Sequence, residues 1–327
     1  VRKELFARNP GLTELNVSLV MNDAGKIVRA ELIALDLKDI KPLAGLPDLR
    51  AVVCAATGPD DWSESPAKAP LSDLSPLKGL PLQEVCVRHT RVKDLAPLTG
   101  MPLTKLDLTG TRVMDLSVLE GMPLRDLTLS HLAIRDVKPL AGLPLESLNI
   151  SHTEVSNLAP LKGMKLKRLI ATASRIRDIT VLAGMPLTEL NISRTEVTEI
   201  TQLLGMELDD LNLSQTRVRD LTALTALPLR MLNVHATRVK DLNPLRAMPL
   251  KWLDISDTDV RDLSPLRGVP LKGLTLCKTA VRDLSPIQNS PIEEIWLDYN
   301  ADQQPLAETY RAFTIVLLRM PQLQKVN

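Results

Sequence analysis

The side chains best suited to chemistry in this sequence are three histidines at regular spacing. His89, His131 and His152 are separated by multiples of twenty-one positions, so a regular fold would place them in one row. Two imidazoles brought together in that row could bind a metal ion. However, no Cys or carboxylate completes a ligand set there, and no Ser-His-Asp motif accompanies it. We therefore expect a structural position, with neither a metal site nor a catalytic one.

A second regular series consists of aspartates, each at the start of a D-L-x-P-L-like segment: Asp94, Asp115, Asp136, Asp178, Asp220, Asp241, Asp262 and Asp283. A carboxylate in this position can accept the backbone N–H two residues later and so cap a short turn. That role explains the regularity better than calcium binding does. A basic residue precedes most of these aspartates, so the charges largely cancel and indicate a solvated flank.

Composition and motifs restrict the class of function. Lys plus Arg number 40 and Asp plus Glu 39, and this near-zero net charge of +1 argues against a nucleic-acid partner. No apolar run approaches the roughly 18 residues that a membrane span needs. The sequence contains no phosphate-binding Gly-rich loop, no H-E-x-x-H motif and no kinase catalytic loop. We expect no enzyme in this chain, no cofactor and no metal, and a protein or peptide as its partner.

One repeat organises the chain. Leucines recur at every twenty-first position from Leu82, and Ile292 continues the series after ten full periods. Within a period, L-x-L alternates like a half-buried strand, the Pro of D-L-x-P-L favours a short 3₁₀ or extended return, and Gly-Met-Pro turns the chain back. One such coil cannot bury its apolar face alone, so the coils must stack.

These observations predict an α/β solenoid with a parallel β-sheet on the concave face, short 3₁₀ or extended returns on the convex face, and a cap at each end. We expect an N-terminal cap and first irregular repeat (1–57), an insertion loop (58–70), regular repeats (71–300), and a C-terminal helical cap with a last strand (301–327). The N-terminal cap should hold a short helix and strands around 12–20 and 26–32. The apolar stripe of the C-terminal helix is expected to cover the last coil, and binding of a partner is the alternative role.

The insertion loop carries one aromatic candidate for binding. Asp39 and Asp73 are separated by one period and thirteen further positions, and this surplus falls in the loop that holds Trp62. Loops of this length are often functional. The alternative, which we favour, is a connector between the cap and the first regular coil.

The exposed strand positions form the main candidate surface. They are small and polar over most of the chain, as expected of a hydrogen-bonding face or simply of a soluble sheet. We expect the next row, which includes Ser193, Ser214 and Ser256, to face outward as well. Binding energy concentrates in large side chains, and Trp and Tyr are scarce here. We predict a binding patch near the C-terminal end of the repeats, formed by Met231, Trp252, Asp254, Trp296, Asp298 and Tyr299 with Asn191, Asn212 and Asn233. The two tryptophans lie two coils apart, roughly 10 Å by strand spacing. Support of the terminal cap is the alternative role for these aromatics.

The L-x-x-L-x-L pattern, clear in Leu103–Leu108, resembles that of leucine-rich repeats, and the D-L-x-P-L ending resembles the internalin-type repeats of bacterial surface proteins. The array is still more similar to those beside Ser/Thr protein kinases in planctomycetes. The pattern departs from such repeats in one respect, because Thr stands where most of them have Asn, and Leu132 and Ser174 interrupt even this Thr series. The Thr hydroxyls could satisfy the same backbone groups.

The resemblance implies a non-catalytic, monomeric interaction module that binds on its concave face. Because the sequence begins at Val1, we expect a piece of a longer chain, which could be a kinase whose catalytic domain lies upstream. The alternatives are an internalin-like secreted or surface adhesin and the repeat part of an effector enzyme. The location would be cytoplasmic for a free-standing protein, and otherwise the extracytoplasmic part of a membrane-anchored one.

Overall fold

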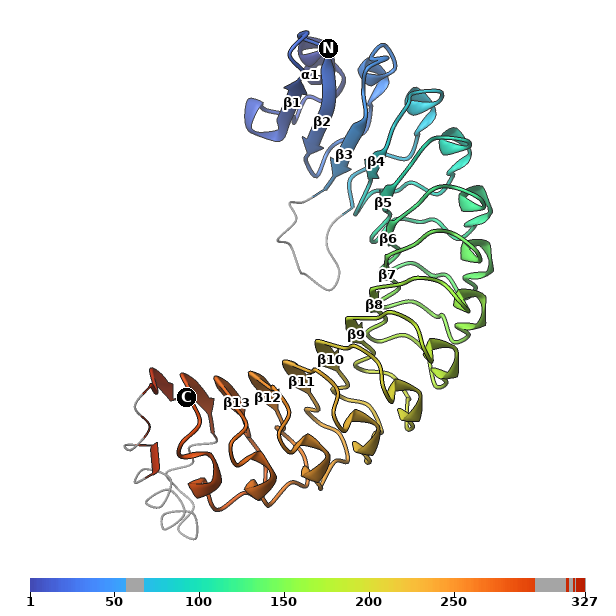
Figure 1. Ribbon diagram of the computed structural model, residues 1–327. Coiled ribbons are helices and arrows are strands. Elements are labelled where there is room, and N and C mark those ends of the chain that lie inside the picture. The colour runs from blue at the N-terminus through green and yellow to red at the C-terminus, as the bar shows by residue number, and fades with distance from the viewer. Residues whose placement is uncertain (57–67, 298–315, 318–319, 321, 327) are drawn as a thin grey trace. The chain divides into compact units, whose positions relative to one another are not determined.

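The structure is a computed structural model that describes residues 1–56, 68–297, 316–317, 320 and 322–326. Its contacts divide the chain into two compact units, residues 1–166 and 167–327. In each unit the strands lie side by side on one face and the 3₁₀ turns lie on the other (Figure 1).

The first unit begins with helix α1 (Arg2–Arg8) and the 3₁₀ turn η1 (Glu14–Asn16). Its strands are β1 (Val17–Met21), β2 (Ile27–Ile33), β3 (Ala51–Ala55), β4 (Glu84–Cys86), β5 (Lys105–Asp107), β6 (Asp126–Thr128) and β7 (Ser147–Asn149). Its further 3₁₀ turns are η2 (Lys41–Leu43), η3 (Ser75–Leu77), η4 (Ala96–Leu98), η5 (Ser117–Leu119), η6 (Lys138–Leu140) and η7 (Ala159–Leu161).

The second unit repeats the same coil. Its strands are β8 (Arg168–Ile170), β9 (Glu189–Asn191), β10 (Asp210–Asn212), β11 (Met231–Asn233), β12 (Trp252–Asp254), β13 (Gly273–Thr275), β14 (Glu294–Trp296) and β15 (Lys325–Val326). Its 3₁₀ turns are η8 (Thr180–Leu182), η9 (Thr201–Leu203), η10 (Thr222–Leu224), η11 (Asn243–Leu245), η12 (Ser264–Leu266) and η13 (Ser285–Ile287).

Strands β1 and β2 pair antiparallel, and the pairs that follow are parallel. From β4 onward the strands of the regular coils pair with an offset of one period. Leu106 pairs with Leu127 in the first unit, and Leu211 pairs with Leu232 in the second. These central strand residues are buried, whereas the first and third residues of most three-residue strands are exposed or half-buried. Because the repeat length is constant, equivalent residues pair on adjacent coils, and leucines fill the interior. The solenoid with a parallel sheet and short 3₁₀ returns is confirmed.

The returns are capped as the sequence predicted. Each aspartate of the series accepts the backbone N–H two residues later, at 2.8 Å for Asp94 to Ala96 and 2.8 Å for Asp178 to Thr180. Asn157 makes the same bond to Ala159 at 2.9 Å. Pro occupies the first turn of several of these 3₁₀ segments, where no N–H is needed.

From β4 to β13, the chain leaves each strand through a turn with a left-handed residue, followed by the Thr position. His131 (φ 58°) and Ala173 (φ 53°) are examples of the left-handed residue. The Thr hydroxyl donates to the carbonyl three residues earlier, at 2.6 Å from Thr216 to Leu213. The predicted role of the Thr hydroxyls is thus confirmed, and Ser174 performs it at 2.7 Å from Ala171.

The N-terminal cap differs from the prediction at its first strand. We expected a strand over residues 12–20, but the strand begins at Val17 and residues 14–16 form η1. The reason is a local capping box, in which Asn16 Oδ1 accepts the Thr13 N–H at 3.1 Å and the Thr13 hydroxyl at 2.7 Å. The Asn16 amide in turn donates to the Ile33 carbonyl at 2.9 Å.

The predicted insertion loop and C-terminal helix lie mostly outside the described residues, so their boundaries stay predictions. The terminal strand expected near 323–326 is present as β15, which pairs in parallel with β14.

Candidate binding surface

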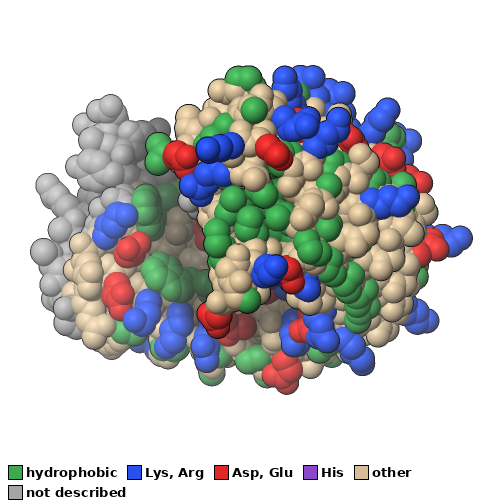
Figure 2. All heavy atoms as spheres, turned by 90° about the horizontal axis from the view of Figure 1, so that it is seen from above, with side chains coloured by type: hydrophobic (Ala, Val, Ile, Leu, Met, Phe, Trp, Pro, Cys, Tyr) green, Lys and Arg blue, Asp and Glu red, His purple; other side chains and the backbone are tan. Residues whose placement is uncertain are grey.

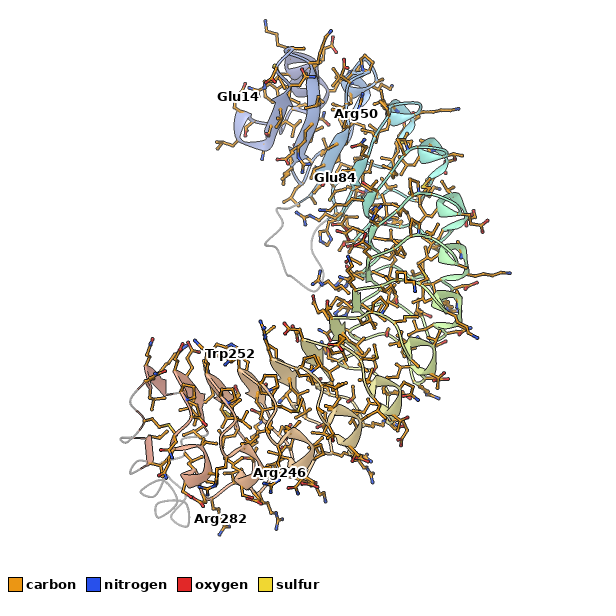
Figure 3. All side chains as sticks on the ribbon, viewed as in Figure 1. Glu14, Arg50, Glu84, Arg246, Trp252 and Arg282 are labelled. Carbon is orange, nitrogen blue, oxygen red and sulfur yellow. The ribbon has the colours of Figure 1, made fainter. Side chains whose placement is uncertain are left out.

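The candidate surface is the outward side of strands β10–β13, which we call the strand face of the second unit. The first residues of these strands pair in sequence: Asp210 with Met231, Met231 with Trp252, and Trp252 with Gly273. Figure 3 shows Trp252 on the strand side of its unit, whereas Arg246 and Arg282 lie on the side of the 3₁₀ turns.

Trp252 forms the centre of this surface. The ring covers Gly273, because a Cβ built on Gly273 would lie 2.0 Å from Trp252 Cε3. The indole is still 41% exposed, and Met231 on the neighbouring strand is 40% exposed. Because Gly273 has no side chain, the Trp252 ring on the neighbouring strand can lie flat against the sheet.

A shallow pocket of about 270 Å³ opens around this ring. The predicted residues Met231, Trp252 and Asp254 line it together with Asn212 and Asn233. The structure adds Asp210, Gly273 and Thr275 to this lining. Asp210 and Gly273 could have been found from the sequence, because they occupy the first strand position of the coils that flank Met231 and Trp252.

The polar side chains at the third strand position use part of their hydrogen-bonding capacity within the protein. Asn212 Oδ1 accepts the Ser214 N–H at 2.9 Å, and Asn233 Oδ1 accepts the His235 N–H at 2.8 Å. Asp254 makes the equivalent bond to Ser256, at 2.9 Å. These oxygens hold the turn after each strand. A partner would thus meet the amide N–H groups of the two asparagines.

The next row departs from expectation. It was expected to be outward-facing, but Ser193, Ser214 and Ser256 are at most 8% exposed. The chain is already turning at this position, so the small hydroxyl packs between coils. Small residues are needed there for packing, and this row contributes little to an exposed surface.

Asp210 has a perturbed carboxyl group at the edge of the surface. Burial raises its pKa above the ordinary value of 3.8, and the nearby charges of Glu189 and Asp209 raise it further, against a lowering by Arg168. The Asp210 carboxyl group at the edge of the pocket is therefore harder to ionise than a free aspartate.

Trp296 does not join this pocket. It is the third residue of β14, whereas Trp252 is the first residue of β12, so the two rings lie two strands apart and at opposite ends of their strands. Trp296 is 39% exposed, and Lys325 Nζ of β15 lies 4.6 Å from its ring centroid. This contact ties Trp296 to the last strand.

Some predicted residues lie elsewhere or outside the described part of the chain. Asn191 is on β9, paired with Asn212, and accepts the Ser193 N–H at 3.0 Å. Asp298, Tyr299 and Trp62 lie outside the described residues, so their membership of a binding site stays a prediction.

The histidine row has a packing role. The rings of His131 and His152 stack with centroids 4.3 Å apart and an interplanar angle of 8°. His89 lies against Gly110, where a Cβ would be 2.6 Å from His89 Nδ1. Within the described residues, no group of three or more His, Cys, Asp or Glu side chains is placed to hold a metal ion.

Two of the three cysteines lack the features of nucleophiles. Cys54 and Cys86 are buried, and burial raises the pKa of both thiols, to about 12 for Cys86. A thiol with a raised pKa is protonated at neutral pH and unreactive. All three cysteines are free of disulfides.

The surface charge is mixed. Figure 2 shows Lys and Arg side chains interspersed with Asp and Glu on the visible face. Ion pairs join adjacent coils, such as Arg135 to Glu154 at 2.7 Å. Among the described residues, no helix has the length and apolar character needed to cross a bilayer.

Comparison with solved structures identifies the fold. An internalin (inlF) from Listeria monocytogenes superposes with a TM-score of 0.76 over 99% of this chain and 93% of that one, at 19% sequence identity. The fold is a leucine-rich-repeat solenoid. A leucine-rich-repeat protein of Leptospira interrogans also matches, with a TM-score of 0.59, 14% identity and coverage of 89% and 92%.

A chain from the LRIM1/APL1C complex matches with a TM-score of 0.51, 14% identity and coverage of 90% of this chain and 55% of that chain. No family model and no curated protein sequence matches the chain. The internalin-like resemblance is therefore confirmed at the level of fold. The resemblance to planctomycete kinase arrays stays a prediction.

Proposed function

We propose that this chain is a non-catalytic protein-protein interaction module that binds a protein or peptide on the strand face of its second unit. Trp252 is the anchor, Met231 extends the apolar contact, and the amides of Asn212 and Asn233 supply hydrogen-bond donors. The observation that carries the proposal is the Trp252 ring, held flat over Gly273 yet 41% exposed. A preorganised, solvent-exposed aromatic ring is typical of an interface hot spot.

One solved structure of similar fold supports the proposal. The matching chain was solved as part of a two-protein complex. A link to a Ser/Thr kinase and an internalin-like adhesin remain the two settings we propose for such a module. The reading frame upstream of Val1 distinguishes them, because a kinase domain supports the first and a secretion signal alone supports the second.

Partner capture tests the proposal. We expect Trp252→Ala to reduce the amount of its partner captured from extracts of the source organism at least tenfold, because truncating a hot-spot residue costs about 2 kcal/mol or more. Met114→Ala is the matched control, because Met114 is 71% exposed and lies outside the strands. Equal capture by both variants and the wild type would refute the assignment.

Melting temperature separates binding from support of the cap. Trp252→Ala should leave the melting temperature nearly unchanged, whereas Trp296→Ala should lower it, because Trp296 contacts Lys325 of the last strand. A large melting drop for Trp252→Ala would assign that ring to stability instead.

A further inference from the structure

A ladder of ion pairs runs along the flank of the solenoid, between the strand ends and the 3₁₀ turns. In each rung, the residue before the capping Asp on one coil faces the residue nineteen positions later on the next coil. Arg135 pairs with Glu154 at 2.7 Å, Arg177 with Glu196 at 2.6 Å, and Lys240 with Asp259 at 3.4 Å. Each of these three rungs thus pairs a base on the first coil with an acid on the second.

One rung of the second unit carries two bases. Arg219 occupies the first position and Arg238 the second, where the three paired rungs have Glu or Asp. Arg217 lies two residues before Arg219 and lines the same pocket. Within the described part of the chain, no ion pair joins any of these three guanidinium groups to a carboxylate. Three positive charges are therefore gathered where the three paired rungs have an acid opposite the base.

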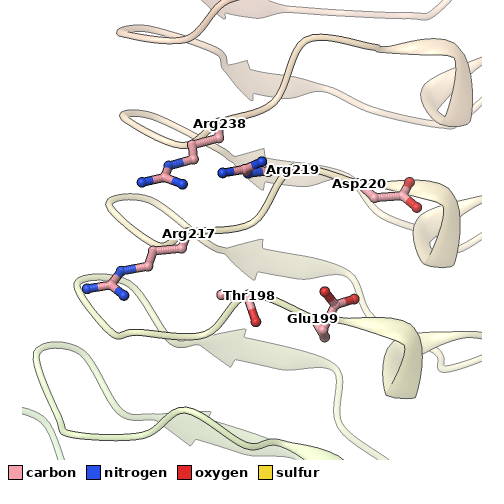
Figure 4. A pocket seen from close by; sticks show the side chains of 6 residues that line it. All are labelled: Thr198, Glu199, Arg217, Arg219, Asp220 and Arg238. Carbon is pink, nitrogen blue, oxygen red and sulfur yellow. The ribbon is translucent and has the colours of Figure 1, made fainter.

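These arginines line a pocket of about 450 Å³ together with Thr198, Glu199 and Asp220. Figure 4 shows the guanidinium groups on the loop side of the pocket and the two carboxylates toward the 3₁₀ turns. The Asp220 carboxylate is committed to its cap, accepting the Thr222 N–H at 2.8 Å and the Thr222 hydroxyl at 2.5 Å. The loop side of the pocket is therefore lined by the N–H donors of the three guanidinium groups.

We propose that this pocket, which we call the arginine pocket, binds a phosphomonoester dianion. Guanidinium groups form paired, charge-assisted hydrogen bonds with phosphate oxygens, and three of them match the oxygens and double charge of a phosphate better than those of a single carboxylate. The site lies on the flank of the coils and is separate from the strand face around Trp252.

The charges suggest a decisive variant. Arg238→Glu recreates the base–acid rung seen at Arg135 and Glu154, so it removes the site while restoring an ion pair. We expect it to weaken binding of a labelled phosphoserine peptide at least tenfold at low ionic strength, measured by fluorescence anisotropy. The melting temperature should be unchanged or higher. Arg238→Gln, which only removes the charge, should weaken binding less than Arg238→Glu.

The chain offers a matched control. Arg91, Lys93 and Arg112 occupy the same three positions six periods earlier, with Lys in place of Arg219. Arg112→Glu makes an identical charge change in the same row, and we expect it to leave the affinity of the arginine pocket unchanged. An equal loss in both variants would indicate general charge attraction and overturn the proposal, as would unaltered binding by Arg238→Glu.

Competition identifies the source of the phosphate. Inorganic phosphate should displace the labelled peptide and acetate should not; displacement by acetate at equal concentration would overturn the phosphate assignment. A phosphoserine peptide that binds at least tenfold more tightly than inorganic phosphate supports a phosphorylated protein as the source. Comparable affinities support a small phosphorylated compound. Failure of both phosphate probes to bind would overturn the proposal.

Discussion

At the scale of single residues, backbone conformation explains which positions the repeat holds constant. From Gly79 to Gly268, the residue before the buried Met, Leu or Val of each turn is left-handed, and in most coils it is Gly, as at Gly205 (φ 73°) and Gly268 (φ 81°). In two coils it is Ala instead: Ala226 (φ 65°) and Ala247 (φ 58°). A left-handed conformation costs a residue with a Cβ about 1–2 kcal/mol.

We therefore predict that Ala226→Gly and Ala247→Gly each stabilise the protein by about 1 kcal/mol. The measurement is the free energy of unfolding in urea. Ala183→Gly is the control, because Ala183 has φ −54° and gains nothing from Gly; we expect that variant to be less stable than the wild type. A loss of stability in both turn variants would show that left-handed strain is not significant at these turns.

The sequence predicted the residue rows well and their exposure less well. The Asp and Thr rows bond as expected because both depend on local geometry within three residues. The Ser row was expected to face outward, but it is buried because the chain turns before that position, which alternation in a strand cannot reveal. The contact of the Trp252 ring with Gly273 depends on packing between two coils. The pattern within one period therefore does not reveal it.

At the scale of the element, most of the 3₁₀ returns are capped by one carboxylate. The backbone N–H and hydroxyl of Thr180 lower the pKa of Asp178 below its ordinary value of 3.8, and Ser117 does the same for Asp115. The pKa values of Asp220 and Asp262 are lowered in the same way. A lowered pKa in the folded state means that these groups stabilise the fold above about pH 4 and that this stability is lost as the pH falls through the lowered values.

Replacing all four of these aspartates by Asn should make the protein less sensitive to acid. An Asn oxygen accepts the same N–H at any pH, as Asn157 does with Ala159 at 2.9 Å. We expect the fall in melting temperature between pH 6 and pH 3 to be smaller in the fourfold variant than in the wild type. Asp48→Asn, outside this row, should not change the fall. An undiminished fall in the fourfold variant would show that the caps do not account for acid sensitivity.

At the scale of the whole molecule, a repetitive scaffold makes its exceptions conspicuous. The repeated coil supplies a uniform core and polar outer rows, and the functional candidates are the coils that break the pattern. On the strand face the exception is Met231, Trp252 and Gly273 in succession, and on the flank it is the arginine pocket. The repeat made the fold predictable from sequence, whereas the identity of a partner is encoded in few, non-repeating side chains.

The central claim is that a partner contacts the strand face at Trp252. The most direct test replaces Trp252 with the photo-crosslinking residue p-benzoylphenylalanine, illuminates the protein with its captured partner, and measures the crosslinked product by gel and mass spectrometry. The same residue placed at Met114 is the comparison. We predict a crosslink from position 252 and little or none from position 114. A crosslink from position 114 alone would contradict binding on the strand face.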